Sequence, residues 1–431
     1  MAGLSRRHFL QGLTTAAGLS LAGCQNLLRK TPTAHVVVVG AGFGGATAAK
    51  TIRLLDAGIR VTLIEPKSHY TTCPASNWLF AGLTSLDKLT LDIRDLHGRY
   101  GVERMAATVA EIEPARRRLR LTDGQSVCYD RLILSPGIAF RWDAMAGYDQ
   151  AAAESFPHAW QAGPGTLLLM RQLQTMPDGG VVIIAAPPDP YRCPPGPYER
   201  ASMMAHWLKQ YKPRSKILIL DPKRSFSKQS LFEAGWTRHY GYGTANSLIE
   251  WHCLADNPIT QFEQGNKTLI SEFGDRFSGH VLNIIPPQTA AALALENGLT
   301  DKSGWCPVKP QTSQSVFDEF IHVIGDAAHF APIPKSAFAA NSEAKSCALA
   351  VVSLINGYEP TEPAWLNTCY SLIAPWHGVS VAGVYTLDDA RAIVAVKGAG
   401  GISSSSSAEN VALEADYARA AYRTLIGNTF A

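Results

Sequence analysis

The feature that most constrains the fold of this chain is a glycine-rich turn between an apolar run and a helical stretch. Residues 36–39 are all valine, as expected for a parallel strand that is buried on both faces. The turn GAGFGGA follows, and Gly40, Gly42 and Gly45 would let the backbone approach a pyrophosphate at a helix start. A second apolar run ends at Glu65, 20 residues past Gly45, where such folds place the acid that binds a ribose. The segment therefore predicts a complete βαβ unit of the dinucleotide-binding type.

A second motif indicates which dinucleotide this unit binds. The sequence IHVIGDAAHF places Gly325 and Asp326 directly after an apolar run. Flavin folds use this arrangement to contact the ribityl side of FAD, whereas a simple NAD domain has no role for it. NAD is the alternative, but the two motifs together predict FAD. Its predicted binding residues in these motifs are Gly40, Gly42, Gly45, Glu65, Gly325 and Asp326.

The middle of the chain repeats the βαβ pattern with a different turn. Apolar runs at 181–184 and 217–220 flank a helical stretch that begins near Pro197, and the second run ends at Asp221. The turn at 185–188 reads AAPP instead of GxGxxG. Proline has no N–H to donate to a pyrophosphate, and the missing glycines prevent a close approach of the backbone. We therefore expect a second Rossmann-like domain that accepts no electrons from NADH or NADPH.

The composition agrees with a globular protein of several domains. Hydrophobic residues make up 46% and charged residues 17% of the 431 positions, and the formal charge of +3 gives no support for nucleic-acid binding. The motifs predict an α/β fold with the following divisions. Signal peptide and linker occupy 1–33, the FAD-binding domain 34–149 and 287–357, the second Rossmann-like domain 150–286, and a smaller C-terminal interface domain 358–431.

The N-terminus has the pattern of an export signal. Residues 5–10, SRRHFL, fit the twin-arginine pattern, and the apolar stretch 13–23 is too short to span a bilayer. It ends in LAGC, a pattern typical of a bacterial lipoprotein cleavage site at Cys24. We therefore expect a periplasmic protein that is exported by the twin-arginine route and anchored to a membrane by lipid on Cys24. The alternative is an ordinary signal peptide, whose removal would leave no anchor.

Three of the eight cysteines stand in distinctive contexts. Cys73 lies in YTTCPASN, Cys193 in YRCPPGPYERAS and Cys369 in LNTCYSLIAP. Cys193 shortly precedes the predicted helix start, and a helix N-terminus favours the reactive thiolate. Glu199 falls in the first turn of that helix. It either offsets the helix dipole or carries protons next to the flavin.

These cysteine contexts, together with FSKQS, WCPV and VIGDA, closely resemble the flavoprotein subunit of flavocytochrome c sulfide dehydrogenase. The resemblance covers nearly all of residues 34–431 and implies a glutathione-reductase-like FAD fold. It also implies a thioether between Cys73 and the 8-methyl carbon of FAD; a small buried thiol is the alternative. Lys335 follows a proline and opens a predicted helix that points at the flavin in such folds. Lys335 would then stabilise negative charge on reduced flavin, unless it is simply a solvated lysine.

The same resemblance implies that Cys193 and Cys369 form a redox-active disulfide, with Cys306 as the competing partner. Hydrosulfide would open this disulfide by exchange, and electrons would pass by way of FAD to a c-type cytochrome. The sequence has no CxxCH motif for attaching a c-type haem. The cytochrome would therefore be a separate subunit or a soluble protein. A quinone as the acceptor, and a non-catalytic flavin-bearing sulfur carrier, are the alternatives. We expect no metal site.

Overall fold

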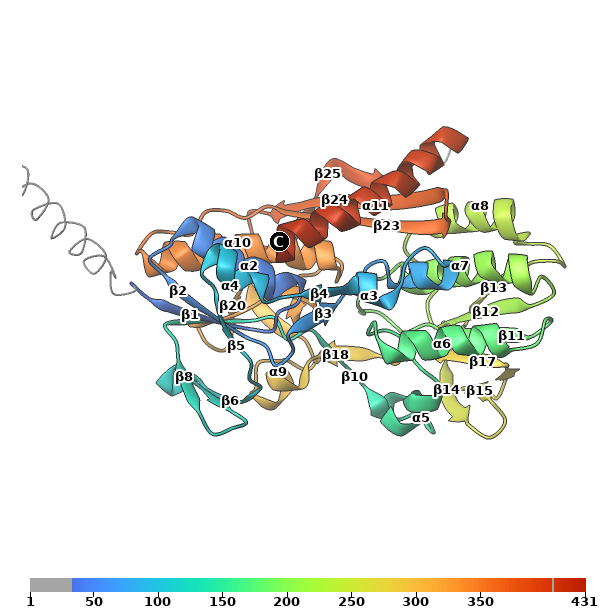
Figure 1. Ribbon diagram of the computed structural model, residues 1–431, viewed down its shortest axis with the longest axis horizontal. Helices are drawn as coiled ribbons and strands as arrows, with labels where there is room; N and C mark the ends of the chain where they lie inside the picture. Colours follow the sequence, from blue (N-terminus) through green and yellow to red (C-terminus); the bar gives the residue numbers. More distant parts are fainter. Residues whose placement is uncertain (1–32, 405–406) are drawn as a thin grey trace, which may run out of the picture.

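Two largely parallel sheets organise residues 33–404 and 407–431, which the computed structural model describes. The predicted leader with Cys24 lies outside the described residues. Figure 1 shows the two sheets in opposite halves of an elongated molecule, with the C-terminal elements lying across both. None of the helices in the described ranges is long and apolar enough to cross a membrane.

The first sheet contains the valine run. Val36 and Val38 face one hydrophobic cluster, and Val37 and Val39 face another, so the strand is buried on both sides. The helices α2 (Phe43–Leu55) and α10 (Ala337–Ile355) pack together over one face, as Figure 1 shows. In spatial order the strands are β22 (Ala328–His329), β19 (Cys306–Lys309), β20 (Gln314–Ser315), β21 (Ile321–Val323), β9 (Arg131–Leu134), β1 (His35–Val39), β2 (Arg60–Ile64) and β5 (Glu103–Met105).

The second sheet is wholly parallel. Its four strands, in spatial order, are β13 (Ile249–Cys253), β12 (Lys216–Asp221), β11 (Val181–Ala185) and β17 (Val281–Ile284). Helix α7 (Gly196–Tyr211) connects β11 to β12. An antiparallel ribbon of β10 (Ile138–Phe140) and β18 (Gln288–Ala290) lies between the two halves, where the chain leaves the first domain and returns.

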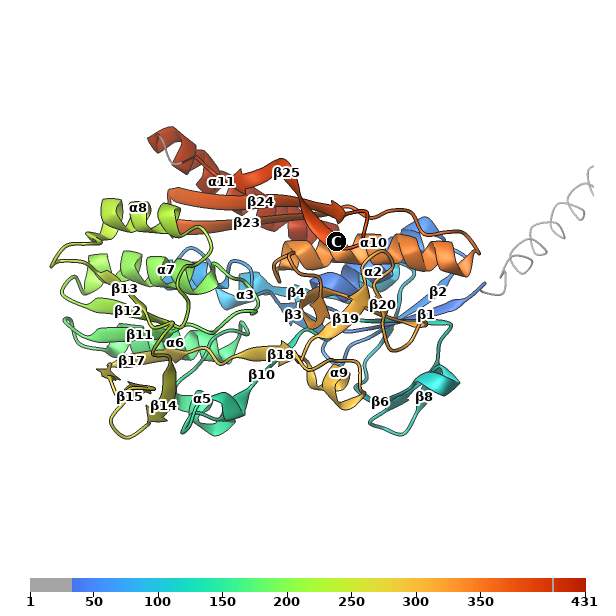
Figure 2. The same ribbon diagram turned by 180° about the vertical axis from the view of Figure 1, so that it is seen from behind.

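The C-terminal part bridges the two halves. Its antiparallel sheet consists of β23 (Trp365–Ala374), β24 (His377–Leu387) and β25 (Ile393–Ile402). Strand β23 contacts α10 of the first half and α7 of the second, and α11 (Ala408–Phe430) packs on this sheet and on α2. Figure 2 shows the same bridge from behind. The predicted fold class, an α/β chain with two Rossmann-like units and a smaller C-terminal part, is confirmed.

The remaining elements connect these layers. They are β3 (His69–Thr71), the 3-10 helix η1 (Ser76–Ala81), α3 (Leu86–Leu89), β4 (Thr90–Asp92), α4 (Asp95–Tyr100), β6 (Val109–Glu113), η2 (Pro114–Arg116), β7 (Arg118–Leu121), β8 (Ser126–Cys128), η3 (Trp142–Ala144), α5 (Gln150–Ser155), α6 (Pro164–Thr175), α8 (Gln229–Tyr240), β14 (Ile259–Glu263), β15 (Thr268–Ser271), β16 (Arg276–Ser278), α9 (Ala292–Glu296) and η4 (Gly325–Ala327).

The glycine turn after β1 is sterically determined. Gly40 has φ +93°, which side chains rarely adopt, and a Cβ on it would lie 2.4 Å from the Ser135 carbonyl oxygen. A Cβ on Gly45 would lie 1.8 Å from the Gly40 carbonyl oxygen. Gly45 therefore lets the first turn of α2 pack directly on the turn that precedes it.

We predict that Gly45→Ala lowers the free energy of unfolding by roughly 2–4 kcal/mol, because the new methyl group overlaps backbone that cannot move aside. Gly427→Ala is the matched control, since Gly427 lies in helix α11 and nothing lies within 4 Å of its added Cβ. The control should be neutral, or stabilising by up to about 1 kcal/mol. Urea unfolding of the purified variants measures both; equal stabilities would contradict the packing role of Gly45.

Candidate active site

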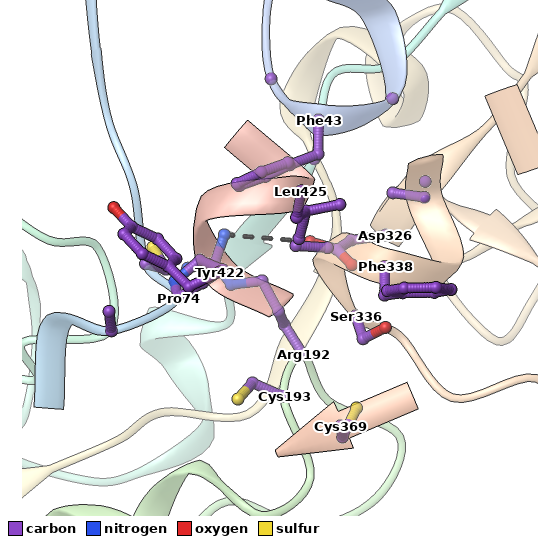
Figure 3. A pocket seen from close by; sticks show the side chains of 18 of the residues that line it. Phe43, Pro74, Arg192, Cys193, Asp326, Ser336, Phe338, Cys369, Tyr422 and Leu425 are labelled. Atoms are coloured by element: carbon purple, nitrogen blue, oxygen red, sulfur yellow. Dashed lines mark ion pairs between the residues drawn. The ribbon is translucent and has the colours of Figure 1, made fainter. Parts of the chain in front are cut away.

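A cavity of about 330 Å³ lies where the first half, the second half and the C-terminal elements meet. Figure 3 shows side chains from all three parts directed around it, with the ion pair of Arg192 and Asp326 on one side and Cys193 and Cys369 on another. Most of the residues predicted from the sequence line this cavity. They are Gly40, Gly42, Glu65, Cys73, Cys193, Glu199, Gly325, Asp326 and Cys369.

The glycine turn forms one wall and leaves backbone exposed to the cavity. Gly42 is the N-cap of α2, so that the unpaired N–H groups of the first turn begin here. Glu65, at the end of β2, accepts hydrogen bonds from the backbone N–H groups of Ala41 (3.2 Å) and Lys67 (3.1 Å). The turn thus presents N–H donors, and Glu65 presents a carboxylate next to them. This arrangement suits the pyrophosphate and ribose of a dinucleotide.

The surroundings of Asp326 show whether the residues at this site suit a flavin. Its Oδ1 atom is buried and has no hydrogen-bond partner among the described residues, and its Oδ2 lies 3.9 Å from Nη1 of Arg192. Burial raises the pKa of Asp326, and Arg192 opposes this. An unpartnered buried acceptor is costly unless a ligand donates to it, as a ribityl hydroxyl would. The residues therefore fit FAD.

Two predicted cofactor residues do not line the cavity. Gly45 contacts the protein backbone, as described above. Lys335 precedes α10, and its Nζ donates to the carbonyls of Asp326 and Ala328, both at 2.8 Å, and lies 3.9 Å from the centroid of the Trp305 ring. Carbonyl oxygens and a ring face stabilise an ammonium better than the positive end of a helix does. Lys335 thus has protein partners and does not line the cavity, and its effect on reduced flavin stays a prediction.

Cys73 lies on the cavity wall between β3 and η1. Its sulfur is half-buried and lies 3.6 Å from the Trp160 carbonyl oxygen. The preceding residue, Thr72, is tied to α11 by a 2.8 Å hydrogen bond with the Tyr422 hydroxyl. The thiol is thus held at the edge of a cavity that carries the flavin motifs.

Cys193 and Cys369 line this same cavity, although the two positions are 176 residues apart. The described cysteines are all free thiols, so the predicted disulfide between Cys193 and Cys369 is not formed here. Burial, followed by the nearby Cys369, raises the pKa of Cys193. Cys306 is fully buried in β19 and does not line the cavity. The structure thus places Cys369, and not Cys306, in the cavity with Cys193.

Cys193 is held in a strained backbone conformation. Its φ is +60°, in the left-handed region that non-glycine residues seldom adopt. Its N–H donates to the Lys335 carbonyl at 2.8 Å, and its own carbonyl accepts from Gly196, the first residue of α7, also at 2.8 Å. Such strain persists where surrounding contacts over-determine the geometry, which is common at reactive positions.

Glu199 is buried and connects three elements. Its Oε1 accepts from the Trp78 indole (3.1 Å) and from the backbone N–H of Leu372 (2.9 Å), and its Oε2 accepts from Asn77 (3.0 Å). These donors come from η1 and β23, whereas Glu199 lies in α7. The contacts give Glu199 a structural task beyond offsetting a helix dipole.

Two cations near the cysteines were missed by sequence reasoning. Arg192, immediately before Cys193, donates to the Trp160 carbonyl. Lys228 is 5% exposed, and its Nζ donates to the Cys369 carbonyl at 3.0 Å. Both stand within segments that carry the resemblance, YRCPPGPYERAS and FSKQS, which is the signal that could have identified them.

In the second sheet, protein side chains occupy the position where a nucleotide would bind. Asp221, at the end of β12, is fully buried and accepts from the hydroxyl of Tyr198 (2.6 Å) and the indole of Trp251 (2.9 Å). Its other oxygen lies 2.6 Å from Nζ of Lys223, which also donates to the Pro187 carbonyl. The acid that would bind a nucleotide ribose is therefore engaged within the protein.

Comparisons with known families agree with this architecture. Residues 166–286 match the central region of the sulfide dehydrogenase [flavocytochrome c] flavoprotein chain, and 361–430 match the flavin-binding region of flavocytochrome c sulphide dehydrogenase. Residues 34–157 match the pyridine nucleotide-disulphide oxidoreductase family.

Among individual proteins, the flavoprotein chain of flavocytochrome c sulfide dehydrogenase of Chlorobaculum thiosulfatiphilum is 62% identical over 45 residues, which cover 10% of this chain and 94% of that sequence. The mitochondrial sulfide:quinone oxidoreductase of Dictyostelium discoideum is 21% identical over 332 residues, or 74% of this chain and 70% of that protein. The solved structure of the Aquifex aeolicus sulfide:quinone oxidoreductase superposes with a TM-score of 0.70 at 16% identity, covering 92% of each chain. A putidaredoxin reductase–putidaredoxin complex superposes with a TM-score of 0.64 at 17% identity, covering 89% of this chain and 93% of that one. At such identities the structures show the shared fold.

We predict that neither NADH nor NADPH reduces the bound flavin at a catalytic rate, because proline and the Asp221–Lys223 ion pair occupy the second nucleotide position. Anaerobic stopped-flow absorbance of the flavin measures this. Dithionite is the control and should bleach the flavin fully. Rapid bleaching by NADH would show that the second domain binds a nucleotide in some other way.

Proposed function

This chain belongs to the family of the flavoprotein chains of flavocytochrome c sulfide dehydrogenase, and on that premise we propose that it oxidises hydrosulfide at a Cys193–Cys369 disulfide and passes the electrons by way of covalent FAD to a c-type cytochrome. The family matches make it a sulfide-oxidising flavoprotein oxidoreductase. The disulfide, the covalent bond and the cytochrome are the parts that we propose.

The observation that supports the disulfide is the convergence of two thiols on the cavity that holds the flavin motifs. Loss of two protons and of two electrons, which FAD could accept when bound, would close the bond between the two thiols. Hydrosulfide then attacks one of its sulfur atoms, a new S–S bond forms to that sulfur, and the S–S bond between the cysteines breaks. The products are a persulfide on one cysteine and a thiolate on the other. The electron pair of the broken bond stays on the thiolate sulfur.

The charges around the cavity favour an anionic substrate. Three cations, Arg192, Arg200 and Lys228, lie close to the cysteine pair and outnumber the nearby carboxylate of Glu199. Arg200 is buried and donates to Asn77, Asn283 and two backbone carbonyls, all of which are neutral. Burial lowers the pKa of Arg200 to about 10, and nearby Cys193 and Cys73 oppose this. Buried cations with neutral partners stabilise negative charge that enters or develops nearby.

The residues that would hold FAD are the glycine turn, Glu65 and Asp326, with Cys73 as the proposed point of attachment. FAD, when bound, accepts two electrons and releases them one at a time, which a single-electron haem acceptor requires. Tyr422 and Leu425 of α11 line the cavity and help to exclude water from it.

A quinone is a second candidate acceptor. The supporting observation is the names of two relatives. The Dictyostelium discoideum protein is a sulfide:quinone oxidoreductase, and the Aquifex aeolicus protein is a sulfide-quinone reductase. We also propose twin-arginine export to the periplasm and a lipid anchor on Cys24, which would bring the protein close to membrane quinone. The third alternative, a sulfur carrier without turnover, predicts that sulfide leaves the flavin oxidised.

We predict that acid-precipitated protein stays yellow, because Cys73 holds FAD by a thioether. Cys73→Ala should release FAD into the supernatant while leaving the fold intact. Absorbance of the pellet and the supernatant measures where the FAD is found. Circular dichroism of the variant before precipitation checks its fold. Free FAD released from the unsubstituted protein would contradict the covalent bond.

We predict that Cys193→Ser and Cys369→Ser each abolish flavin bleaching by anaerobic sulfide, because neither variant can form the disulfide. Dithionite should still bleach both. Cys306→Ser is the matched control and should keep sulfide-driven bleaching, since its sulfur lies outside the cavity. Loss of bleaching in Cys306→Ser alone would show that the wrong partner was chosen.

After bleaching by sulfide, cytochrome c and a soluble quinone are added in separate experiments. Faster return of the oxidised spectrum with cytochrome c would support the first acceptor, and faster return with quinone the second. Absence of bleaching in the unsubstituted protein would favour the sulfur-carrier alternative.

A further inference from the structure

The two residues that precede α10 are linked to both cysteines of the cavity. The Lys335 carbonyl accepts a hydrogen bond from the backbone N–H of Cys193 at 2.8 Å. The Ser336 hydroxyl donates to the Oδ1 atom of Asn367 at 2.6 Å. The thiol of Cys369 donates to that same oxygen at 3.6 Å. The start of α10 therefore reaches Cys193 through its backbone and the sulfur of Cys369 through the side chain of Asn367.

Strand β23 brings Asn367 and Cys369 together, because residues two apart in a strand point to the same face. Asn367 is buried, with 2% of its surface exposed, and a buried carboxamide requires hydrogen-bond partners. A carboxamide oxygen can accept two hydrogen bonds. Here they come from the Ser336 hydroxyl and the Cys369 thiol. The sulfur of Cys369 thus has an acceptor that the protein itself supplies.

Ser336 determines which way the carboxamide of Asn367 faces. Ser336 is the N-cap of α10, and its Oγ accepts a hydrogen bond from the backbone N–H of Ala339 at 3.0 Å. Its hydroxyl proton is then left to donate to Asn367. A donor at this position assigns the oxygen of the carboxamide, and not its NH₂ group, to the side of Ser336 and Cys369. The helix cap therefore keeps an acceptor in front of the thiol.

The hydrogen bond from Cys369 is available in only one redox state of the cysteine pair. Reduction of a disulfide adds two electrons and two protons, and one of these protons becomes the S–H of Cys369. A disulfide sulfur carries no hydrogen and cannot donate. Asn367 keeps its bond with Ser336 in either state, so that oxidation leaves its oxygen partnered. The contact therefore stabilises the dithiol and not the disulfide, and a stabilised dithiol makes the disulfide more oxidising.

We propose that Asn367, held by Ser336, is a positioning residue that raises the reduction potential of the Cys193–Cys369 pair by accepting the S–H of Cys369. Its role in turnover rests on the proposed function. There, hydrosulfide opens the disulfide, and the sulfur that is released carries the electron pair of the broken bond. When that sulfur is Cys369, it takes up a proton from solvent and gains this hydrogen bond. A higher potential makes the disulfide easier for hydrosulfide to open.

The test measures the potential without sulfide. Flavin-loaded protein is equilibrated under anaerobic conditions with mixtures of reduced and oxidised dithiothreitol and quenched with acid. Differential alkylation and peptide mass spectrometry then give the oxidised fraction of the pair. Asn367→Leu removes the acceptor at similar volume and should make the pair roughly threefold to tenfold harder to reduce. A tenfold change in this equilibrium lowers the potential by about 30 mV.

Three further variants separate the hydrogen bond from damage to the fold. Asn367→Asp keeps an acceptor oxygen and should leave the potential unchanged or raise it. Ser336→Ala frees the carboxamide to turn and should lower the potential, which guards against a folding defect of the leucine variant. Ser342→Ala is the matched control and should leave the potential unchanged. Ser342 also lies in α10, and its hydroxyl accepts from the backbone N–H of Leu366 in β23 at 3.0 Å.

Infrared spectra of the dithiol form report on the hydrogen bond directly. The S–H stretching band that disappears in Cys369→Ser belongs to Cys369. Asn367→Leu should move this band to higher wavenumber, because a thiol without an acceptor has a stiffer S–H bond. An unchanged band, or a potential that does not fall in folded Asn367→Leu protein, would overturn the inference. An equal fall in Asn367→Asp or Ser342→Ala would overturn it as well, because the hydrogen bond would then not be the cause.

Flavin bleaching by sulfide separates this inference from the proposed function. If sulfide leaves the flavin of the unsubstituted protein oxidised but the potential still falls in Asn367→Leu, the proposed function fails and the redox role of Asn367 stands. If sulfide bleaches the flavin but the potential is unchanged in Asn367→Leu, the proposed function survives and this inference is wrong. A pair that oxidised dithiothreitol cannot close in the unsubstituted protein would overturn both.

Discussion

The cavity depends on the buried carboxylate of Glu199. It accepts hydrogen bonds from Asn77, Trp78 and the backbone of Leu372, which belong to parts of the chain that are far apart in sequence. Removing one partner of a buried carboxylate leaves an unsatisfied charge, which costs several kcal/mol. The loop after Cys73, the start of α7 and the strand of Cys369 are therefore held at fixed positions around the same space. Cys73, Cys193 and Cys369, which these segments carry or adjoin, all line this space.

The same βαβ unit occurs twice in the chain, with opposite outcomes. In the first half, glycines keep side chains away from the turn, and an unpartnered oxygen of Asp326 is left for a ligand. In the second half, prolines and the Asp221–Lys223 ion pair occupy the equivalent position. The second unit supplies Cys193, Glu199 and Lys228 instead. One copy of the fold thus carries the flavin motifs, and the other carries residues of the proposed sulfur chemistry.

Burial controls the electrostatics of the site. Cys193, Arg200, Lys228 and Asp326 all have pKa values shifted towards the neutral form by desolvation. Each of these groups would be stabilised by an opposite charge or a donor at the right place. The proposed disulfide exchange would move one negative charge between two sulfur atoms, and the buried cations are positioned to stabilise that charge.

The sequence by itself determined the local features of this protein. The valine run, the glycine turn, Glu65 and the Gly325–Asp326 pair each owe their role to backbone sterics and strand order within a short segment, so the fold class and the flavin motifs could be predicted from residue types alone. The AAPP turn was equally local, because proline lacks an N–H in any context.

Only the tertiary structure decided which distant groups meet. Spacing could not choose between Cys306 and Cys369 as the neighbour of Cys193; the choice follows from the packing of β23 against α7. The sequence also could not predict that the Lys335 ammonium contacts a backbone carbonyl and the Trp305 ring. Nor did it predict that Lys228 contacts the Cys369 carbonyl. A long charged side chain adopts the rotamer that gives its charged group the most favourable contacts within its length. Those contacts come from elements that meet only when the chain folds.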